Sequence, residues 1–367
     1  MKRMDIDQIL KYMVENDASD LYFIVGAPPV MKVKGSNQFI GSNVLTPKDT
    51  DELVNFFLDQ RMQAQFKEIP EMNLSYGLSD IGRFRINIFR QRGSAGLVIR
   101  LVKLKLPNID GLKLPPILKE IVLGKRGLIL LTGATGTGKS TTLAAMIDHR
   151  NSLLSGHIIT IEDPIEFIHP HKKSIVTQRE IGIDTHSFSD ALRNALRQAP
   201  DVILIGEMRD LETVQSAIYF SETGHLILST LHANNSNQAL ERMINFFGSE
   251  EQHQILLQLS LNLKAIVAQR LIPRSDGKGL CAAVEILIAT ARVKELIEKG
   301  DIATIKAAIA AGSQEGMQSF DQDLHRLYRE GFISYEDALK YADSPNDLRL
   351  KIKTGDGISK EVKFDLS

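Results

Sequence analysis

The sequence predicts an α/β protein with a small N-terminal α+β domain, a larger α/β domain and a mainly helical C-terminal part. Two observations carry this prediction. Before residue 105, short segments with the two-residue alternation of strands lie between helical segments. After residue 127, short apolar runs that are typical of buried strands lie between segments with helical spacing. A chain of 367 residues is also too long for one core and suggests two or three domains.

Composition and charge exclude several classes of protein. The net charge is -1, so no strong basic field favours nucleic acid or anionic lipid as a partner. The single cysteine, Cys281, excludes an internal disulfide framework and a cysteine-rich zinc site, and its apolar surroundings predict a buried core strand. No apolar stretch of 18 residues and no signal-peptide pattern occurs, which predicts a cytoplasmic protein.

The first hundred residues predict a small domain of helices and strands. We expect helices over 5–16 and 46–66, and strands over 21–25, 30–34, 74–78, 83–89 and 96–101. Residues 105–116 contain three prolines and read as a linker between domains. The predicted division is 1–104 for the N-terminal domain, 105–116 for the linker, 117–290 for the α/β core, 291–350 for the helical part and 351–367 for a polar tail.

One strand of the N-terminal domain carries a row of arginines. In residues 83–90, Arg83 and Arg85 share a face with Asn87, while the apolar residues between them share the other. Arg100 ends the next strand. Such a row can be a solvated sheet face, or it can present arginines to a phosphate on this subunit or a neighbour.

A glycine-rich loop follows the apolar run 128–131. Its spacing, Gly133-x-x-x-x-Gly138-Lys139-Ser140, is that of a P-loop. The glycines let successive backbone N–H groups face one anion, and the following helix adds its positive end. Lys139 can reach the β- and γ-phosphates of ATP, and the Ser140 hydroxyl is a ligand for Mg²⁺. The predicted nucleotide-binding residues are Gly133, Ala134, Thr135, Gly136, Thr137, Gly138, Lys139, Ser140 and Thr141.

Acidic residues follow two other predicted strands. The run 157–161 leads into Glu162, Asp163 and Glu166, and the run 201–205 leads into Glu207. In open α/β sheets, ligands bind beyond the carboxyl ends of the strands. A carboxylate of the first group can therefore polarise the water that attacks the γ-phosphate, although a charged surface turn is the alternative. Glu207 can hold Mg²⁺ directly or through water.

Histidines lie at both ends of a further predicted strand, which we expect to lie beside the strand before the P-loop. His225 and His232 can each sense the γ-phosphate, although a histidine at a strand end is usually only structural. His169 and His171 lie in a loop without further ligands, and we assign no metal to them.

Taken together, these motifs resemble those of the secretion-type hexameric ATPases, and within them the PilT/PilU family of type IV pilus retraction ATPases. The resemblance covers nearly the whole chain. It rests on residues 18–21 with 26–29, 83–90, 133–140, 161–167, 201–210 and 223–234.

The resemblance implies a PAS-like N-terminal domain, a RecA-like ATPase domain and a ring of six subunits. It implies that Glu166 is the catalytic glutamate, Glu207 the Walker B glutamate, and His232 the histidine of the His box, with His225 as its companion. It further implies that Arg85 and Arg100 are brought to the γ-phosphate across a subunit boundary, which favours the functional interpretation of the arginine row.

The resemblance also implies partners and a place in the cell. These are an inner-membrane pilus platform protein, pilin only indirectly, and the paralogous main retraction ATPase, at the cytoplasmic face of the inner membrane. The absence of a four-cysteine zinc site favours retraction over extension. Residues 291–298 match the main retraction motor poorly, whereas 316–321 and 343–350 resemble the accessory, PilU-type branch. A non-catalytic nucleotide-binding adaptor and a nucleic-acid motor are the alternatives, and the neutral charge argues against the second.

Overall fold

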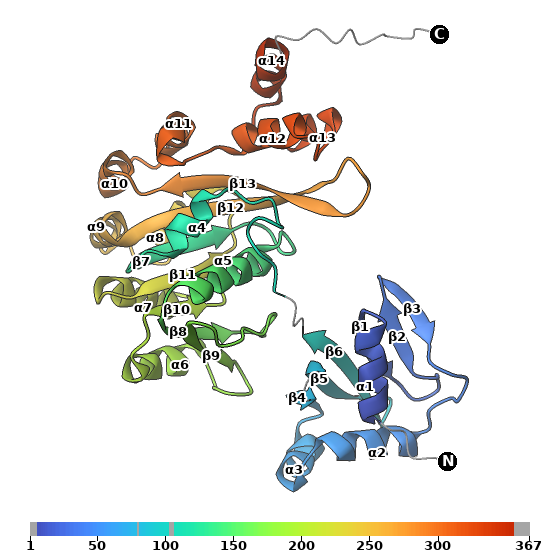
Figure 1. Cartoon of the computed structure of the whole chain (residues 1–367). Helices are drawn as coiled ribbons and strands as arrows, with labels where there is room; N and C mark the ends of the chain where they lie inside the picture. Colours follow the sequence, from blue (N-terminus) through green and yellow to red (C-terminus); the bar gives the residue numbers. More distant parts are fainter. Residues whose placement is uncertain (1–5, 79–80, 103–105, 356–367) are drawn as a thin grey trace, which may run out of the picture. The chain divides into compact units, whose positions relative to one another are not determined.

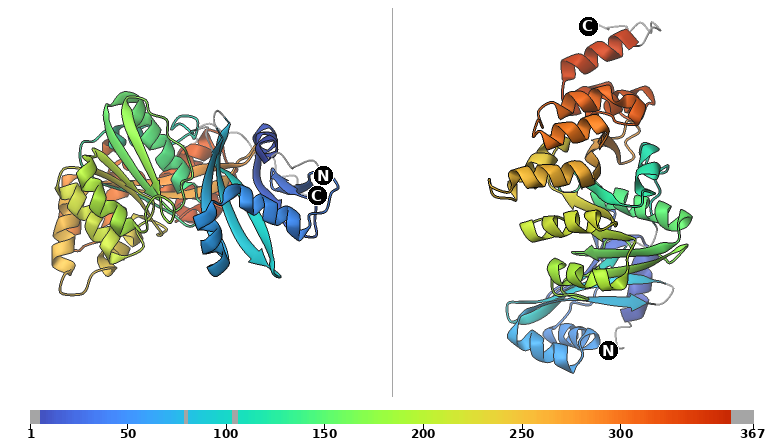
Figure 2. Two further views of the ribbon diagram at one scale, coloured as in Figure 1. Left: turned by 90° about the horizontal axis from the view of Figure 1, so that it is seen from below. Right: turned by 90° about the vertical axis from the view of Figure 1, so that its left-hand side faces the viewer.

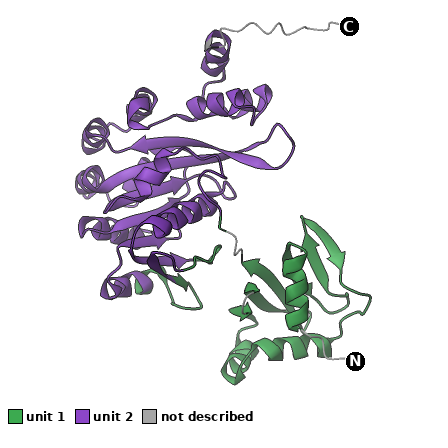
Figure 3. Cartoon of the chain, viewed as in Figure 1, with its two compact units in different colours: residues 1–106, 163–170, 178–190 green, residues 107–162, 171–177, 191–367 purple. Residues whose placement is uncertain are grey.

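The computed structural model of the chain describes residues 6–78, 81–102 and 106–355. Two compact units are present (Figure 3). The first comprises residues 1–106, 163–170 and 178–190, and the second comprises 107–162, 171–177 and 191–367. Each unit has its own sheet and its own hydrophobic core.

The first unit is built on a six-stranded antiparallel sheet with the order β3-β2-β1-β6-β5-β4. Its strands are β1 (Ala18–Phe23), β2 (Val30–Val33), β3 (Ser36–Phe39), β4 (Glu71–Leu78), β5 (Gly82–Gln91) and β6 (Ser94–Val102). Its helices are α1 (Ile6–Glu15), α2 (Pro47–Phe57) and α3 (Gln60–Glu68) (Figure 1). The core lies between these helices and one face of the sheet, and Leu10, Phe23 and Ile86 are among its buried side chains.

The alternation predicted for the arginine strand is confirmed. Phe84, Ile86 and Ile88 of β5 are fully buried, whereas Arg85 and Asn87 between them are only partly buried. One apolar face therefore packs on the helices, and the arginines lie on the other.

The single helix expected over residues 46–66 is wrong, because two helices are present. Leu58 adopts an extended backbone at the end of α2. Asp59 then caps α3 by accepting the Met62 backbone N–H at 2.8 Å. An aspartate in this position favours a new helix start over continuation of the old helix. Strand β3 was not predicted, because all four of its residues are exposed and all except Phe39 are polar.

The second unit is built on a seven-stranded sheet with the order β13-β12-β7-β11-β10-β8-β9. Its strands are β7 (Gly127–Thr132), β8 (Gly156–Glu162), β9 (Ser174–Glu180), β10 (Val202–Ile205), β11 (Leu226–Leu231), β12 (Leu263–Pro273) and β13 (Leu280–Ile288). Strands β8, β10, β11, β7 and β12 run parallel, and β13 is antiparallel to β12. The carboxyl ends of the parallel strands therefore meet at one edge of the sheet.

Helices cover both faces of this sheet (Figure 2). They are α4 (Ile117–Val122), α5 (Lys139–Leu153), α6 (Phe188–Ala195), α7 (Leu211–Glu222), α8 (Ser236–Asn245), α9 (Gln252–Asn262), α10 (Ala291–Glu298), α11 (Ile305–Ala311), α12 (Phe320–Arg329), α13 (Tyr335–Tyr341) and α14 (Pro345–Gly355). Residues of α4 and α5 share one core cluster with Ile129, Leu131 and Val267. Residues of α12 to α14 share another with Ala268 and Ile272, which alternate with Val267 along β12.

The C-terminal half differs from expectation in two places. The chain beyond Gln252 is mainly helical, as predicted, with helices α9 to α14, but β12 and β13 also form a long hairpin there, of which only the strand around Cys281 was expected. The polar tail does not begin at residue 351, because α14 continues to Gly355 and buries Ile352. Residues 356–367 of the expected tail, and residue 105 of the expected linker, lie outside the described residues.

One buried carboxyl group should make stability depend on pH. Glu285 of β13 is 2% exposed, and its side chain accepts the Ser236 backbone N–H at 2.8 Å where α8 begins. Burial raises its pKa above the ordinary 4.5 because the charged form is costly to desolvate, while the hydrogen bonds from Ser236 partly oppose this.

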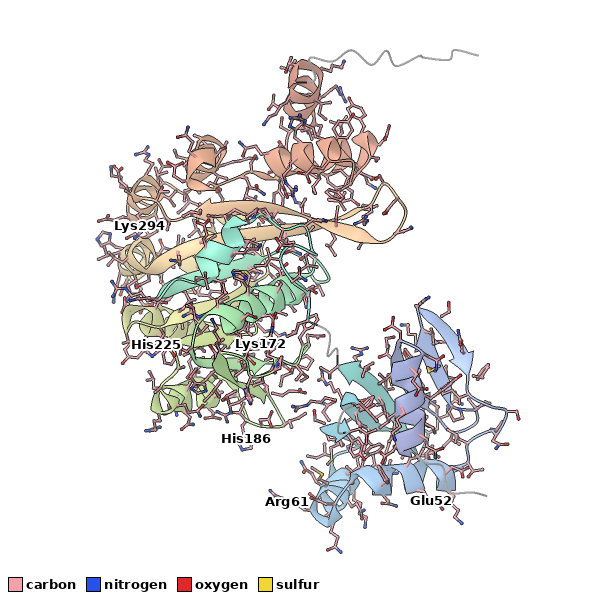
Figure 4. The ribbon with its side chains drawn as sticks, in the orientation of Figure 1. Glu52, Arg61, Lys172, His186, His225 and Lys294 are labelled. Atoms are coloured by element: carbon pink, nitrogen blue, oxygen red, sulfur yellow. The ribbon has the colours of Figure 1, made fainter. Side chains whose placement is uncertain are left out.

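As the pH rises from 4.5, we expect the Tm of the wild-type protein to fall relative to the Tm of the Glu285→Gln variant. A carboxyl group whose pKa is raised on folding contributes stability below its unfolded pKa, and this is lost as the pH rises through the folded pKa. The glutamine still accepts the Ser236 N–H but carries no charge. Thermal melts at a series of pH values test this, with Glu52→Gln on the surface of α2 as the control (Figure 4). Parallel Tm profiles for wild type and Glu285→Gln would contradict it.

Candidate nucleotide-binding site

The P-loop begins where the fully buried strand β7 ends at the edge of the sheet. Its three glycines adopt positive φ angles of 149°, 81° and 86° at Gly133, Gly136 and Gly138. A Cβ atom on Gly133 would lie 2.5 Å from the Thr137 hydroxyl oxygen and 2.6 Å from the Gln269 carbonyl oxygen. Only glycine fits this backbone conformation and this space, so the glycine at the start of the P-loop motif has a steric cause.

The loop leads directly into the amino end of α5. Gly138 is the N-cap residue of this helix, and no side chain caps it. The first N–H groups of the helix are therefore available for an anion, and the helix dipole favours negative charge there. Ser140 is exposed and Thr141 is partly buried in the first turn.

Lys139 lies inside the curve of the loop. Its Nζ donates hydrogen bonds to the carbonyl oxygens of Gly133 at 2.8 Å and Ala134 at 3.0 Å. Burial lowers the pKa of Lys139, and the negative charge of Glu207 acts in the opposite direction. The ammonium group and the Glu207 carboxylate therefore interact at this edge of the sheet.

Glu207 and His232 follow neighbouring parallel strands and lie in contact. The His232 Nε2 atom is 3.0 Å from Glu207 Oε1, and Arg209 Nε donates to Glu207 Oε2 at 2.8 Å. The Glu207 side chain is 18% exposed, so these contacts are only partly screened by water. The expected neighbourhood of β11 and β7 is present, with Leu231 beside Thr132. Arg209 was not predicted, although its position two residues after Glu207 was a usable signal.

Hydrogen bonds between β11 and the segment after β10 support this cluster. The Thr230 hydroxyl donates to the Gly206 carbonyl oxygen at 2.7 Å, and the Met208 N–H donates to the Thr230 carbonyl oxygen at 2.9 Å. Arg242 of α8 donates to the His232 carbonyl oxygen at 3.0 Å. The backbone on both sides of the Glu207–His232 contact is therefore held in place.

His225 does not lie at this edge of the sheet. It precedes β11, and its carbonyl oxygen accepts the N–H of Gly127, the first residue of β7. Its Nδ1 lies 3.0 Å from the Phe220 carbonyl oxygen, at the end of α7 (Figure 4). The P-loop follows the other end of β7, roughly 20 Å away for a strand of this length. The structure therefore contradicts a contact between His225 and a phosphate bound by the loop of the same chain.

Glu166, Arg85 and Arg100 belong to the first unit. Arg100 forms an ion pair with Asp20 at 2.8 Å. This hydrogen-bonded pair raises the pKa of Arg100, and the charge of Glu166 adds to the effect. Arg85 Nε lies 3.8 Å from Glu180. Glu180 is the last residue of β9 and lies in the 178–190 segment of the first unit, because the division between the units falls within that strand. Both arginines therefore have acidic partners within the first unit, and their predicted contact with a nucleotide stays a prediction.

Oxygen ligands for Mg²⁺ are present beside the loop in the second unit. The Ser140 hydroxyl is exposed at the start of α5, and the Glu207 carboxylate interacts with Lys139. Among the described residues no group of three or more His, Cys, Asp or Glu side chains can hold a metal. This donor set fits Mg²⁺, which usually takes one or two protein ligands together with water and phosphate oxygens.

A family model described as "Type II/IV secretion system protein" matches residues 2–328. The chain is 52% identical to the type IV pilus ATPase PilU of Pseudomonas aeruginosa, over 96% of this chain and 92% of that protein. It is 40% identical to PilT, named a type IV pilus retraction ATPase, of the same organism, over 94% of this chain and 100% of that protein.

Solved structures agree with these relatives. A crystal structure of the pilus retraction motor PilT with bound ADP superposes with a TM-score of 0.87 and 40% identity, over 95% of this chain and 99% of that one. The α/β fold class predicted from the sequence, with an N-terminal domain before a RecA-like ATPase domain, is thereby confirmed. No helix among the described residues is long and apolar enough to cross a membrane.

Proposed function

Since the chain belongs to the type II/IV secretion system protein family, and within it to the PilT/PilU-type pilus retraction ATPases, we propose that it works as a hexameric motor that retracts type IV pili. ATP is its substrate, and the identity to PilU and PilT over nearly the whole chain makes it a secretion-type ATPase. The observation that carries the proposal is the contact between Glu207 and His232 beside Lys139 in the P-loop.

We propose that each residue at the carboxyl edge of the sheet has a separate task. Backbone N–H groups of residues 133–141 and the Lys139 ammonium hold the β- and γ-phosphates. Ser140 and Glu207 hold Mg²⁺, which neutralises charge on the phosphate oxygens when bound. His232 and Arg209 orient the Glu207 carboxylate, because each contacts one of its two oxygens.

Water attack and charge neutralisation are assigned to residues of the first unit. Glu166 follows β8 and is exposed, so a water molecule can reach its carboxylate and give up a proton to it. Arg85 and Arg100 act on the γ-phosphate of a neighbouring subunit in a ring of six. Hydrolysis then depends on assembly, because an isolated subunit lacks the arginines of its neighbour.

We assign the accessory role to this ATPase, in a pilus machine that includes the main retraction ATPase and an inner-membrane platform protein. Support comes from the higher identity to PilU, 52%, than to PilT, 40%, over nearly the same length. Pilin is then moved only indirectly, by the platform protein, and the protein works at the cytoplasmic face of the inner membrane.

Deletion of this gene alone, of the main motor's gene alone and of both genes together tests this proposal. We expect loss of this gene to reduce retraction force under load while unloaded pili still retract. Loss of the main motor's gene should abolish retraction whether or not this gene is present. Pilus retraction measured with optical traps gives both quantities. Full retraction under load without this gene would contradict a role in retraction. Retraction in the strain that lacks only the main motor would contradict the accessory role.

A further inference from the structure

A buried glutamine lies directly beneath the P-loop and has no part in the assignments above. Gln269 belongs to β12, the strand beside β7, and follows Ala268, which pairs with Thr132 at the end of β7. Only 3% of Gln269 is exposed. A polar side chain buried so deeply in a sheet core is costly unless it is fully hydrogen-bonded.

The Gln269 amide group joins the loop to the helix that follows it. Its Nε2 donates to the Thr137 carbonyl oxygen at 2.6 Å, and its Oε1 accepts the Thr142 hydroxyl at 2.8 Å. A carbonyl oxygen can only accept, so the Thr137 contact fixes which end of the amide is which. One side chain therefore holds both the middle of the loop and the first turn of α5.

The bond to Thr137 sets the direction of the next N–H group. In a trans peptide, the C=O and the following N–H point in opposite directions within one plane. When the Thr137 carbonyl points down to Gln269, the Gly138 N–H points up, away from the sheet core. This is the direction in which a P-loop presents its N–H groups to a phosphate.

Because the loop has glycines at positions 133 and 138, no Cβ atom occupies the space that Gln269 fills. A Cβ on Gly138 would lie 2.8 Å from Gln269 Nε2, and a Cβ on Gly133 would lie 2.6 Å from the Gln269 carbonyl oxygen. The loop thus rests on the backbone and the side chain of the same residue. Its shape depends on β12 as well as on its own sequence.

We propose that Gln269 is a positioning residue for nucleotide binding, which orients the Thr137–Gly138 peptide so that its N–H faces the bound phosphate. It acts through the loop backbone and touches no reacting atom. The proposal deepens the nucleotide-binding function proposed for the loop. Its test compares variants with wild type, so failure of wild-type protein to bind ADP would count against that function instead.

The test is the affinity for ADP of the Gln269→Leu variant, which keeps the size of the side chain but loses both hydrogen bonds. We expect the Kd to rise about tenfold or more, because the Gly138 N–H loses its fixed direction. A tenfold rise corresponds to a loss of about 1.4 kcal/mol of binding free energy. Thr142→Val should have a smaller effect, and Thr142→Ser should restore wild-type affinity. The double variant should be no weaker than Gln269→Leu alone, because both changes act through one amide.

Gln318→Leu is the matched control. Gln318 also donates its amide N–H to a backbone carbonyl, that of Val284 at 3.0 Å, but in the part of the structure that packs α12 on β13. We expect this change to lower Tm while the Kd for ADP stays at the wild-type value. Wild-type Kd in folded Gln269→Leu, or an equal rise in Kd for Gln318→Leu, would overturn the proposal. Additive effects of Gln269→Leu and Thr142→Val would overturn it as well.

Discussion

Glu166→Gln should lower ATP turnover by about 10²- to 10⁴-fold, the usual contribution of general acid–base catalysis. The amide keeps the size of the side chain and its ability to accept a hydrogen bond, but it cannot take a proton from the attacking water. Glu166 is exposed, so the change removes no core packing. Phosphate release by the assembled protein measures turnover, and equilibrium binding of ATP should remain within a factor of about three of wild type.

This variant also separates the motor from a non-catalytic adaptor. An adaptor would support retraction equally well with Glu166→Gln, since it needs only bound nucleotide. The control is Glu52→Gln, which makes the same chemical change on the exposed surface of α2. Turnover at the wild-type level in Glu166→Gln would contradict its role as the base. Loss of ATP binding together with turnover would indicate a structural role instead.

Much of the nucleotide site could be predicted because its signals are local in sequence. Strands β7, β10 and β11 contain short apolar runs, which by themselves predict buried strands. The P-loop, Glu207 and His232 follow these strands and lie at one edge of the sheet because the strands are parallel. The same rule separates the two histidines. His232 follows β11 and reaches Glu207, whereas His225 precedes it and lies at the far edge.

What could not be predicted depends on partners far away in the chain. Strand β12 was missed because Lys264, Gln269 and Arg270 interrupt its apolar residues, so its pattern suggests no buried strand. Gln269 is satisfied by Thr137 and Thr142, more than 120 residues earlier. Arg270, on the opposite side of the strand, donates to the Tyr341 carbonyl oxygen at 2.9 Å and stacks over Phe320.

The arginines of the first unit should have the largest effect of all. We expect Arg100→Ala or Arg85→Ala to lower turnover by about 10³- to 10⁵-fold, as for other NTPases that receive an arginine from a neighbour. Arg100→Lys should rescue little, because an ammonium lacks the planar fork that matches phosphate oxygens. Steady-state turnover measures this, and Arg61→Ala on exposed α3 is the control (Figure 4). Turnover within tenfold of wild type would contradict the assignment.

Mixing two inactive variants tests whether the arginine acts across a subunit boundary. In a ring that contains Arg100→Ala and Glu166→Gln subunits, some sites combine an intact Glu166 from the first variant with an intact Arg100 from the second. If the arginine reaches a neighbour, these sites are complete and the mixture should hydrolyse ATP far faster than either variant alone. If Arg100 serves the nucleotide of its own subunit, every site lacks one of the two groups and mixing restores nothing. Turnover of the mixture no higher than the average turnover of the two variants measured alone would therefore contradict the shared site, and with it the dependence of hydrolysis on the ring.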